Sequence, residues 1–339
     1  MKQRNTDCHY FTNVFPLPAI LKSDTPKMTA ILKDKSFQLS TILTTIFIGT
    51  GIAFLFFGLV DYSWILFGLL PVVLGVAIGT MKVRKYALWG AIITTILLLI
   101  AIYIPGLSGV ICIVMAIGLV VPFIFLGYVI ATLVRKYRIM KETNSLPVLL
   151  LPLIPFLIAA PTEHFLRKDK ETIIEVRTEK VFNYTPEQVY DAIKSVDTLD
   201  AEKPFLLKLD LPIPTKCVLA KEEVGALRTC YFKGGRLSNA DFGGGTITER
   251  VTQLERGKVL KMDVIDYNLI GRKWLGFKEA IYYFEPSGNN GCKLTRITTY
   301  TSVLTPRLYW EPMEKLGVRQ EHDYVFNNLG KDLRTKYGR

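Results

Sequence analysis

The sequence predicts two parts: a membrane-embedded helical region, and after it an α+β domain in which a curved antiparallel sheet of about seven strands wraps a long C-terminal helix. Two observations predict this fold class. The first half contains four long apolar runs without a charged residue, and the second half contains seven strand-like runs followed by one helical pattern. We place a polar tail at residues 1–36, the membrane anchor at 37–166 and the α+β domain at 167–339.

The positive charge of the chain has two sources. Up to Leu166 there are 13 basic and 6 acidic residues, and from Arg167 onward there are 29 and 24. The first surplus lies beside apolar runs, as the positive-inside rule predicts, and the second is mixed with acids, as on a solvated surface. We therefore expect a membrane partner and no nucleic-acid partner. The five cysteines and three histidines are scattered, so we expect small buried cysteines, no disulfide framework, no metal site and no cofactor.

Residues 1–36 form a polar and weakly patterned tail. They lack the apolar core and the cleavage site of a secretory signal. Met28 stands just ahead of the first apolar run, so either Met1 or Met28 is a plausible start of translation.

Four apolar runs predict membrane-spanning helices, because a helix needs roughly 20 such residues to cross the hydrocarbon core. Basic residues precede the first run, follow the second and follow the fourth, so they all lie on one side of the membrane. The positive-inside rule makes this the cytoplasmic side, which also holds the N-terminus and residues 135–141. None of the runs carries a charge, which favours an anchor over a transport path. The runs are Phe37–Val60, Ser63–Thr80, Tyr86–Ile104 and Val110–Val134.

A fifth apolar segment, Leu146–Ala160, has 15 residues and three prolines. At about 1.5 Å per residue it is shorter than the bilayer core, although extended to Leu166 it just crosses. It is either a kinked fifth span or a segment in the interface, and the choice decides the side of the α+β domain. Arg167, Lys168 and Lys170 favour the cytoplasmic side, but whole domains translocate largely regardless of such charges.

From Glu171 the pattern changes to strands separated by turns. Ile174, Val176 and Thr178 alternate with polar neighbours, as in a half-buried strand. Thr185 and Gln188 form a capping box for a short helix that begins at Pro186. Six further strands follow, at Lys216–Ala220, Ala226–Lys233, Thr246–Leu254, Val259–Asp266, Phe277–Phe284 and Lys293–Ser302.

The C-terminal helix is predicted to begin with Thr305 as N-cap and Pro306 as the first helical residue. Its apolar positions change phase near Gly317, which predicts a kink or a restart there. A strongly curved sheet around such a helix leaves a space between them, and such a pocket is the default ligand site. The apolar stripe of the helix contains Val318, His322, Val325, Leu329 and Leu333.

Residues from about Ile173 to Lys336 resemble the START-like superfamily, which includes polyketide cyclases, dehydrases and lipid-transport proteins, and within it a bacterial subgroup with multi-span N-terminal anchors. The resemblance covers about half of the chain. It implies a helix-grip fold that binds a hydrophobic molecule between the sheet and the helix. It is carried by LPIP at 211–214, VGALRTCYF at 224–232, ITERVTQLERGKVLKMDV at 247–264, TRITTYTSVLTPRLYW at 295–310 and EHDYVFNNL at 321–329.

Three charged or titratable side chains are candidates for the site. His322 shares the apolar face of the C-terminal helix, where it is either an acid or base or a core histidine held by a strand residue. Glu249 shares one strand face with Ile247 and Val251. If that face points inward, the buried carboxylate of Glu249 needs a positively charged partner, and Arg228 is the obvious candidate. This pair either binds a carboxylate or hydroxyl of a ligand or is a structural ion pair.

Aromatic residues complete the candidate ligand site. Tyr300, Tyr309 and Trp310 flank the strand–helix junction, and Trp274 and Phe277 follow a turn. They either contact ligand at the mouth of the cavity, pack in the core, or lie at the headgroup level of a bilayer. A glycine-rich hairpin at residues 234–245 is no phosphate loop, because no Lys-Ser/Thr follows, and is a candidate lid.

These observations predict a membrane-tethered domain that binds or transfers a lipid-like or polyketide-like molecule. The first alternative is an enzyme of the cyclase or dehydrase type with His322 and Glu249 as acid and base. The second is a partner-binding or sensory domain whose cavity is filled by large side chains such as Tyr231, Phe232 and Trp274.

Overall fold

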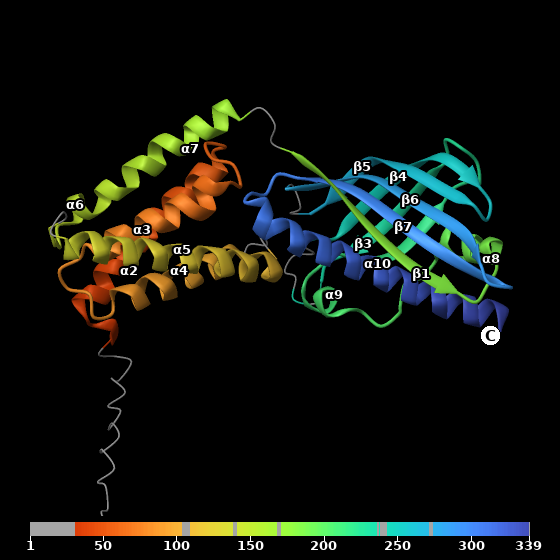
Figure 1. Cartoon of the computed structure of the whole chain (residues 1–339), viewed down its shortest axis with the longest axis horizontal. Coiled ribbons are helices and arrows are strands. Elements are labelled where there is room, and N and C mark those ends of the chain that lie inside the picture. The colour runs from red at the N-terminus through yellow and green to blue at the C-terminus, as the bar shows by residue number, and fades with distance from the viewer. Residues whose placement is uncertain are drawn as a thin grey trace, which may run out of the picture.

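A computed structural model describes residues 31–103, 109–137, 141–167, 171–235, 237, 243–270 and 274–338. The molecule is elongated, with apolar helices at one end and the sheet with its C-terminal helix at the other (Figure 1). Most of the predicted tail, including Met1 and Met28, lies outside the described residues. So do Lys168, Lys170 and most of the tip of the glycine-rich hairpin.

The N-terminal half is a bundle of apolar helices. Asp34 caps the first of them, accepting a hydrogen bond from the backbone N–H of Ser36. Gly75 and Gly127 allow α3 and α5 to approach so closely that a Cβ on either glycine would lie within 2.1 Å of a carbonyl oxygen of the other helix. The helices are α2 (Lys35–Phe56), η1 (Ile65–Leu69), α3 (Leu70–Gly79), α4 (Ala87–Tyr103), α5 (Val110–Lys136), α6 (Leu146–Leu150), η2 (Leu151–Leu153) and α7 (Ile154–Leu166).

Among the described residues, three helices are long and apolar enough to cross a membrane: Lys35–Phe56, Val110–Lys136 and Leu146–Leu166. The prediction of four or five full spans is therefore confirmed only in part. Within the described residues, two of the predicted runs form shorter helices, Ile65–Gly79 and Ala87–Tyr103. The proline-rich segment continues as helix to Leu166, which makes it long enough to span.

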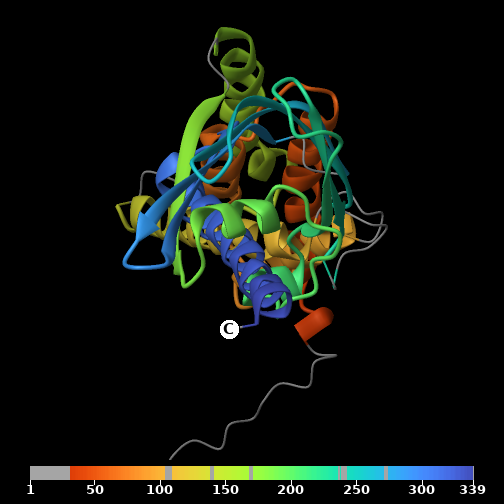
Figure 2. The ribbon, with the colours of Figure 1, turned by 90° about the vertical axis from the view of Figure 1, so that its right-hand side faces the viewer.

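The C-terminal half contains one seven-stranded antiparallel sheet in the order β1-β7-β6-β5-β4-β3-β2. The predicted strands are confirmed, with alternating burial along β1 and β4. Viewed along the long axis, the sheet arches over the C-terminal helix (Figure 2). The strands are β1 (Thr172–Phe182), β2 (Ile213–Leu219), β3 (Leu227–Lys233), β4 (Gly245–Glu255), β5 (Val259–Leu269), β6 (Leu275–Ser287) and β7 (Gly291–Ser302).

Three helices accompany the sheet: α8 (Pro186–Ile193), α9 (Phe205–Leu209) and α10 (Arg307–Tyr337). The capping box of Thr185 and Gln188 is present as predicted. The predicted start of α10 is wrong by one residue, because Pro306 is the N-cap and Thr305 instead bonds the carbonyl of Tyr62. The predicted restart near Gly317 is also wrong, since α10 is one continuous helix of 31 residues.

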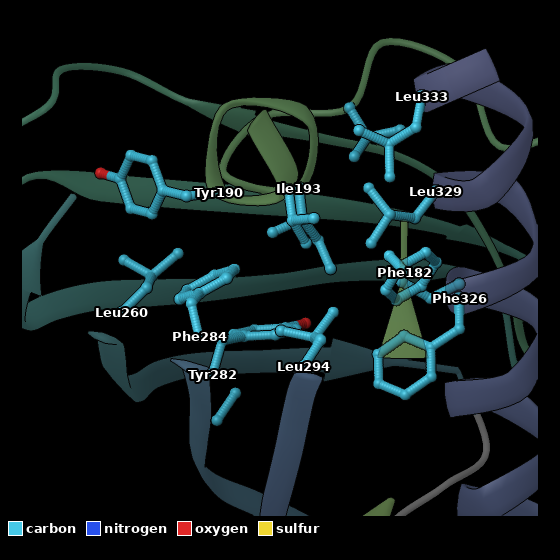
Figure 3. Close-up of a cluster of buried hydrophobic side chains, with 14 of the residues drawn as sticks. Phe182, Tyr190, Ile193, Leu260, Tyr282, Phe284, Leu294, Phe326, Leu329 and Leu333 are labelled. Carbon is cyan, nitrogen blue, oxygen red and sulfur yellow. The ribbon is translucent and has the colours of Figure 1, made fainter. Parts of the chain in front are cut away.

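The hydrophobic core of the sheet domain lies at its end distant from the bundle. Side chains of β1, α8, β5, β6, β7 and the second half of α10 meet there (Figure 3). Phe182 packs edge-on against Phe326, and Tyr190 packs similarly against Phe284. This end of the domain is filled, so the space between sheet and helix remains at the end that faces the bundle.

Cys217 and Cys230 form a disulfide between the paired strands β2 and β3. The expectation that the cysteines are merely small buried residues is therefore wrong for these two. They occupy opposed register positions on the two strands, with Cα atoms 4.0 Å apart. Burial raises the pKa of the Cys292 thiol to about 12, so Cys292 stays protonated at neutral pH.

The sheet domain docks on one end of the bundle through the start of α10. The Tyr309 hydroxyl donates to the carbonyl of Met115 over 2.6 Å, and the backbone N–H of Thr305 donates to the carbonyl of Tyr62 over 2.9 Å. The ring of Trp310 lies 5.2 Å from that of Phe67. These contacts join the mouth of the curved sheet to the ends of the apolar helices.

Candidate functional site

A cavity lies between the concave face of the sheet and α10 and continues toward the bundle, with a total volume of about 360 Å³. Its walls in this domain come from β2 to β7 and from the first half of α10, and they are mostly apolar. The size is within the range of sites that hold one small molecule. The wall side chains include Ile247, Val264, Leu269, Phe277, Ala280, Val318 and Val325.

Arg228 and Glu249 meet in the wall of this cavity. They are register partners on β3 and β4, and an Arg228 guanidinium nitrogen lies 2.8 Å from a Glu249 carboxylate oxygen. Arg228 also donates to the backbone carbonyls of Lys194 and Ile193. Arg228 is 3% exposed and Glu249 is 7% exposed, so the pair is compensated by mutual charge and by backbone acceptors.

A second ion pair joins the sheet to α10. Arg296 on β7 donates a hydrogen bond of 3.2 Å to the carboxylate of Glu321, and its other terminal nitrogen lies 3.0 Å from the second carboxylate oxygen. The guanidinium groups of Arg228 and Arg296 both lie over the ring of Tyr282, at 6.0 and 5.5 Å from its centroid. The inner end of the cavity therefore carries two arginines and two glutamates around one aromatic ring.

The imidazole of His322 is fully buried between α10 and the sheet, where two threonines hold it. Its Nε2 lies 2.8 Å from the hydroxyl of Thr298, and its Nδ1 lies 2.9 Å from the hydroxyl of Thr178. Burial, with the nearby charge of Arg296, lowers the pKa of His322 well below 6.5. The neutral ring is thus held on both sides, which matches the core-histidine alternative.

This environment makes the stability of the fold depend on pH. Because the folded state disfavours the imidazolium and the unfolded state does not, stability falls as pH drops below 6.5. Between pH 7.5 and pH 5.5 we expect the folded state to lose about 1.4 kcal/mol through this group. The measurement is the free energy of unfolding at both pH values, for the natural chain and for His322→Gln. Equal pH dependence in the two proteins contradicts the assignment.

The predicted aromatic residues divide into two groups. Trp274, Phe277 and Trp310 line the cavity. Tyr300 packs beside Val318 in the core, where burial and the charge of Glu314 raise the pKa of its hydroxyl. Tyr309 bonds α5 and contributes to the junction with the bundle.

Several residues of the site were not anticipated from the sequence. Arg296, Glu321 and Tyr282 line the cavity together with Glu279 and Glu314. Arg296 stands between Thr295 and Ile297 on β7, and Glu321 lies in a polar stretch of α10, so only the packing of helix on sheet brings them together. Among the described residues, no group of three His, Cys, Asp or Glu side chains is placed to hold a metal ion.

A curled antiparallel sheet closed by a C-terminal helix, with an apolar cavity between them, defines the helix-grip class of fold. No family model matches the sequence, and no curated protein matches it either. Solved structures resemble about half of the chain.

Three of these solved structures are a protein of unknown function from Staphylococcus aureus, the Zhui aromatase/cyclase from Streptomyces sp. R1128, and norcoclaurine synthase from Thalictrum flavum in complex with dopamine and hydroxybenzaldehyde. They are 14%, 14% and 12% identical to this chain, with TM-scores of 0.35, 0.34 and 0.33. They match 50%, 49% and 50% of this chain and 98%, 98% and 91% of their own. At these values the likeness carries no argument about function.

Proposed function

We propose that the chain is a membrane-anchored protein whose helix-grip domain binds a hydrophobic small molecule, such as a lipid-like or polyketide-like compound, in the cavity between the sheet and α10. The supporting observation is the cavity of about 360 Å³, with apolar walls and buried Arg228–Glu249 and Arg296–Glu321 pairs at its inner end. Apolar walls supply affinity by removing hydrocarbon from water, and a few fixed polar groups orient the ligand.

The cavity distinguishes this proposal from its two alternatives. The open space argues against a domain whose cavity is filled by its own aromatic side chains. An enzyme with His322 and Glu249 as acid and base requires a titrating imidazole that reaches the ligand. Both nitrogens of His322 face threonine hydroxyls instead, and its pKa is lowered.

The test is a pair of substitutions on adjacent residues of β5. Val264 lines the cavity, whereas Ile265 is 44% exposed on the other face of the strand. Val264→Trp fills part of the space and displaces at least two methylene groups of a ligand, at about 0.8 kcal/mol each, which lowers affinity by roughly tenfold. Ile265→Trp leaves the cavity unchanged and serves as the matched control.

The measurement is native mass spectrometry of the full chain released from detergent, followed by extraction and identification of the bound molecule. We expect the natural protein and Ile265→Trp to carry ligand and Val264→Trp to carry much less. The proposal is abandoned if the natural chain carries no hydrophobic molecule and takes none up from phospholipid vesicles.

A further inference from the structure

The cavity of the helix-grip domain continues into the helical bundle. The same space that touches Val264 and Val325 is also lined by side chains of α2, η1, α3, α4 and α5. Lining residues on the helices include Gly51, Leu55, Leu70, Ile111, Ala116 and Val120. From Ile111 to Val120 the wall runs about 14 Å along α5, nearly half the thickness of a bilayer core.

Glycines close the other end of the bundle by allowing its helices to touch. Gly75, Gly79 and Gly127 bring α3 and α5 together, and Gly90 brings α4 against Ser40 of α2. These contacts lie in the half of the bundle remote from the sheet. Toward the sheet the cavity lies among these helices and is lined by residues of both pairs, including Gly51, Leu70, Leu99 and Ala116.

The two halves of the cavity differ in chemistry. All of its charged lining residues belong to the helix-grip domain: Arg228, Glu249, Glu279, Arg296, Glu314 and Glu321. The lining residues on the described helices of the bundle, α2 to α5, are all uncharged. Two buried donors on the domain side, the indole N–H of Trp310 and the Nε of Arg296, have no hydrogen-bond partner among the described residues. The bundle half suits hydrocarbon, and the domain half suits a head with oxygen acceptors.

We infer that the ligand is a single-chain membrane lipid with a compact, oxygen-bearing head, which enters between the helices. Its hydrocarbon chain lies among α2, α3 and α5, and its head points toward the Arg228 and Arg296 pairs. This inference rests on the proposed function and adds the class of ligand, its orientation and its route. The bilayer supplies the ligand directly, so it does not cross water.

The experiment uses the full chain in phosphatidylcholine vesicles that contain a photoreactive monoacylglycerol or a photoreactive fatty acid. The diazirine is placed near the head in one probe and at the chain end in another. Crosslinked peptides are mapped by mass spectrometry. We expect head-end probes to label β3 to β7 and chain-end probes to label the cavity face of α5. Comparing the two lipids distinguishes a neutral head from a carboxylate.

Bilayer lipid labels the outer faces of the helices in any case, so a blocking variant decides the route. Ala116 lines the cavity on α5, while Val114 on the same helix is 61% exposed. We expect Ala116→Trp to reduce head-end labelling of the sheet by about tenfold or more, and Val114→Trp to leave it unchanged. If the sheet is labelled equally in Ala116→Trp and in the natural chain, the proposed route is wrong and the proposed function stands. No labelling of the sheet in the natural chain overturns the inferred lipid class and its route, whereas the proposed function is decided by the molecule found in native mass spectrometry.

A second, independent inference concerns the side of the membrane on which the helix-grip domain lies. The end of the bundle remote from this domain gathers the connections before α2, between α3 and α4, and between α5 and α6. The backbone of Lys82 bonds Thr143 there, and Arg135 pairs with Glu142. Among the described residues, this end of the bundle has eight basic and two acidic side chains. The end that carries the domain has one basic and two acidic side chains.

We infer that the helix-grip domain lies on the extracytoplasmic side. The basic end belongs in the cytoplasm by the positive-inside rule, which puts the opposite end outside. The disulfide between Cys217 and Cys230 agrees, because disulfides persist in oxidising compartments and are rare in the cytosol. The basic residues that follow Leu166 favour the other side, but they carry less weight than the connections between helices.

The test is labelling of introduced cysteines in right-side-out membrane vesicles by a membrane-impermeant maleimide. Asn289 lies in an exposed turn of the domain, and Val83 is 43% exposed at the basic end. We expect Asn289→Cys to be labelled in sealed vesicles and Val83→Cys only after permeabilisation. The natural chain, with Cys112 partly exposed and Cys292 buried, sets the background. The reverse pattern overturns the inference.

Discussion

Replacing Glu249 by alanine is expected to destabilise the protein by about 3–5 kcal/mol, because it leaves the buried guanidinium of Arg228 without its counter-charge. The side chain of Arg228 is 3% exposed, and water cannot replace the carboxylate. Only the backbone carbonyls of Ile193 and Lys194 remain as acceptors. In a thermal scan of the full chain in detergent, we expect Tm to fall by on the order of 10 °C.

Two controls separate this effect from the loss of any carboxylate. Glu179 on β1 pairs with Arg177 and Lys293 at the surface and is itself 40% exposed, so Glu179→Ala is expected to leave stability nearly unchanged. The double variant Arg228→Met with Glu249→Leu removes both charges and is expected to be more stable than Glu249→Ala alone. A Glu249→Ala protein as stable as Glu179→Ala contradicts the buried pair.

The sequence was sufficient for features that depend on local pattern. The period-2 alternation of Ile174, Val176 and Thr178 identified β1, and the capping box of Thr185 identified α8. The pairing of Arg228 with Glu249 followed from two strands that are consecutive in the chain and therefore neighbours in the sheet.

Features that depend on register or docking were missed. The disulfide between Cys217 and Cys230 requires β2 to pair with β3 in one register, and a register shift between Pro214 and Lys216 intervenes. Arg296 and Glu321 come together only through the angle of α10 on the sheet. Two cysteines on consecutive strands were a usable signal. Periodicity identified the buried stripe of α10, but it does not say which strand residue faces Glu321.

The extension of the cavity into the bundle was also beyond sequence reasoning. Each apolar run was long and apolar enough to be predicted as a membrane span. Length and hydropathy do not indicate where two helices are in contact and where they are apart. Glycines in apolar helices are typical sites of close helix contact, yet their partners depend on the three-dimensional pairing of α3 with α5 and of α2 with α4. That pairing decides which end of the bundle is closed and which is open.

The strongest expected effect on the anchor comes from Gly127→Leu. A Cβ at Gly127 would lie 2.0 Å from the carbonyl oxygen of Val72, and the obstacle is backbone, which no side-chain rotation relieves. Overpacking costs 1–3 kcal/mol in cores that can adjust, so here we expect at least about 3 kcal/mol and poor accumulation in the membrane. The measurements are the amount of full chain in membranes and its Tm in detergent.

Gly49→Leu is the matched control, since nothing lies within 4 Å of a Cβ at Gly49 on α2. The two variants introduce the same side chain into apolar helices, so a difference between them reports the α3–α5 contact and not the loss of a glycine. Comparable Tm values for both variants contradict that contact. The α3–α5 contact closes the bundle at the basic end. If Gly127→Leu breaks this contact, the helices can also separate at that end, and lipid gains a second way in. We therefore expect that, in any Gly127→Leu protein that accumulates, adding Ala116→Trp no longer reduces lipid uptake.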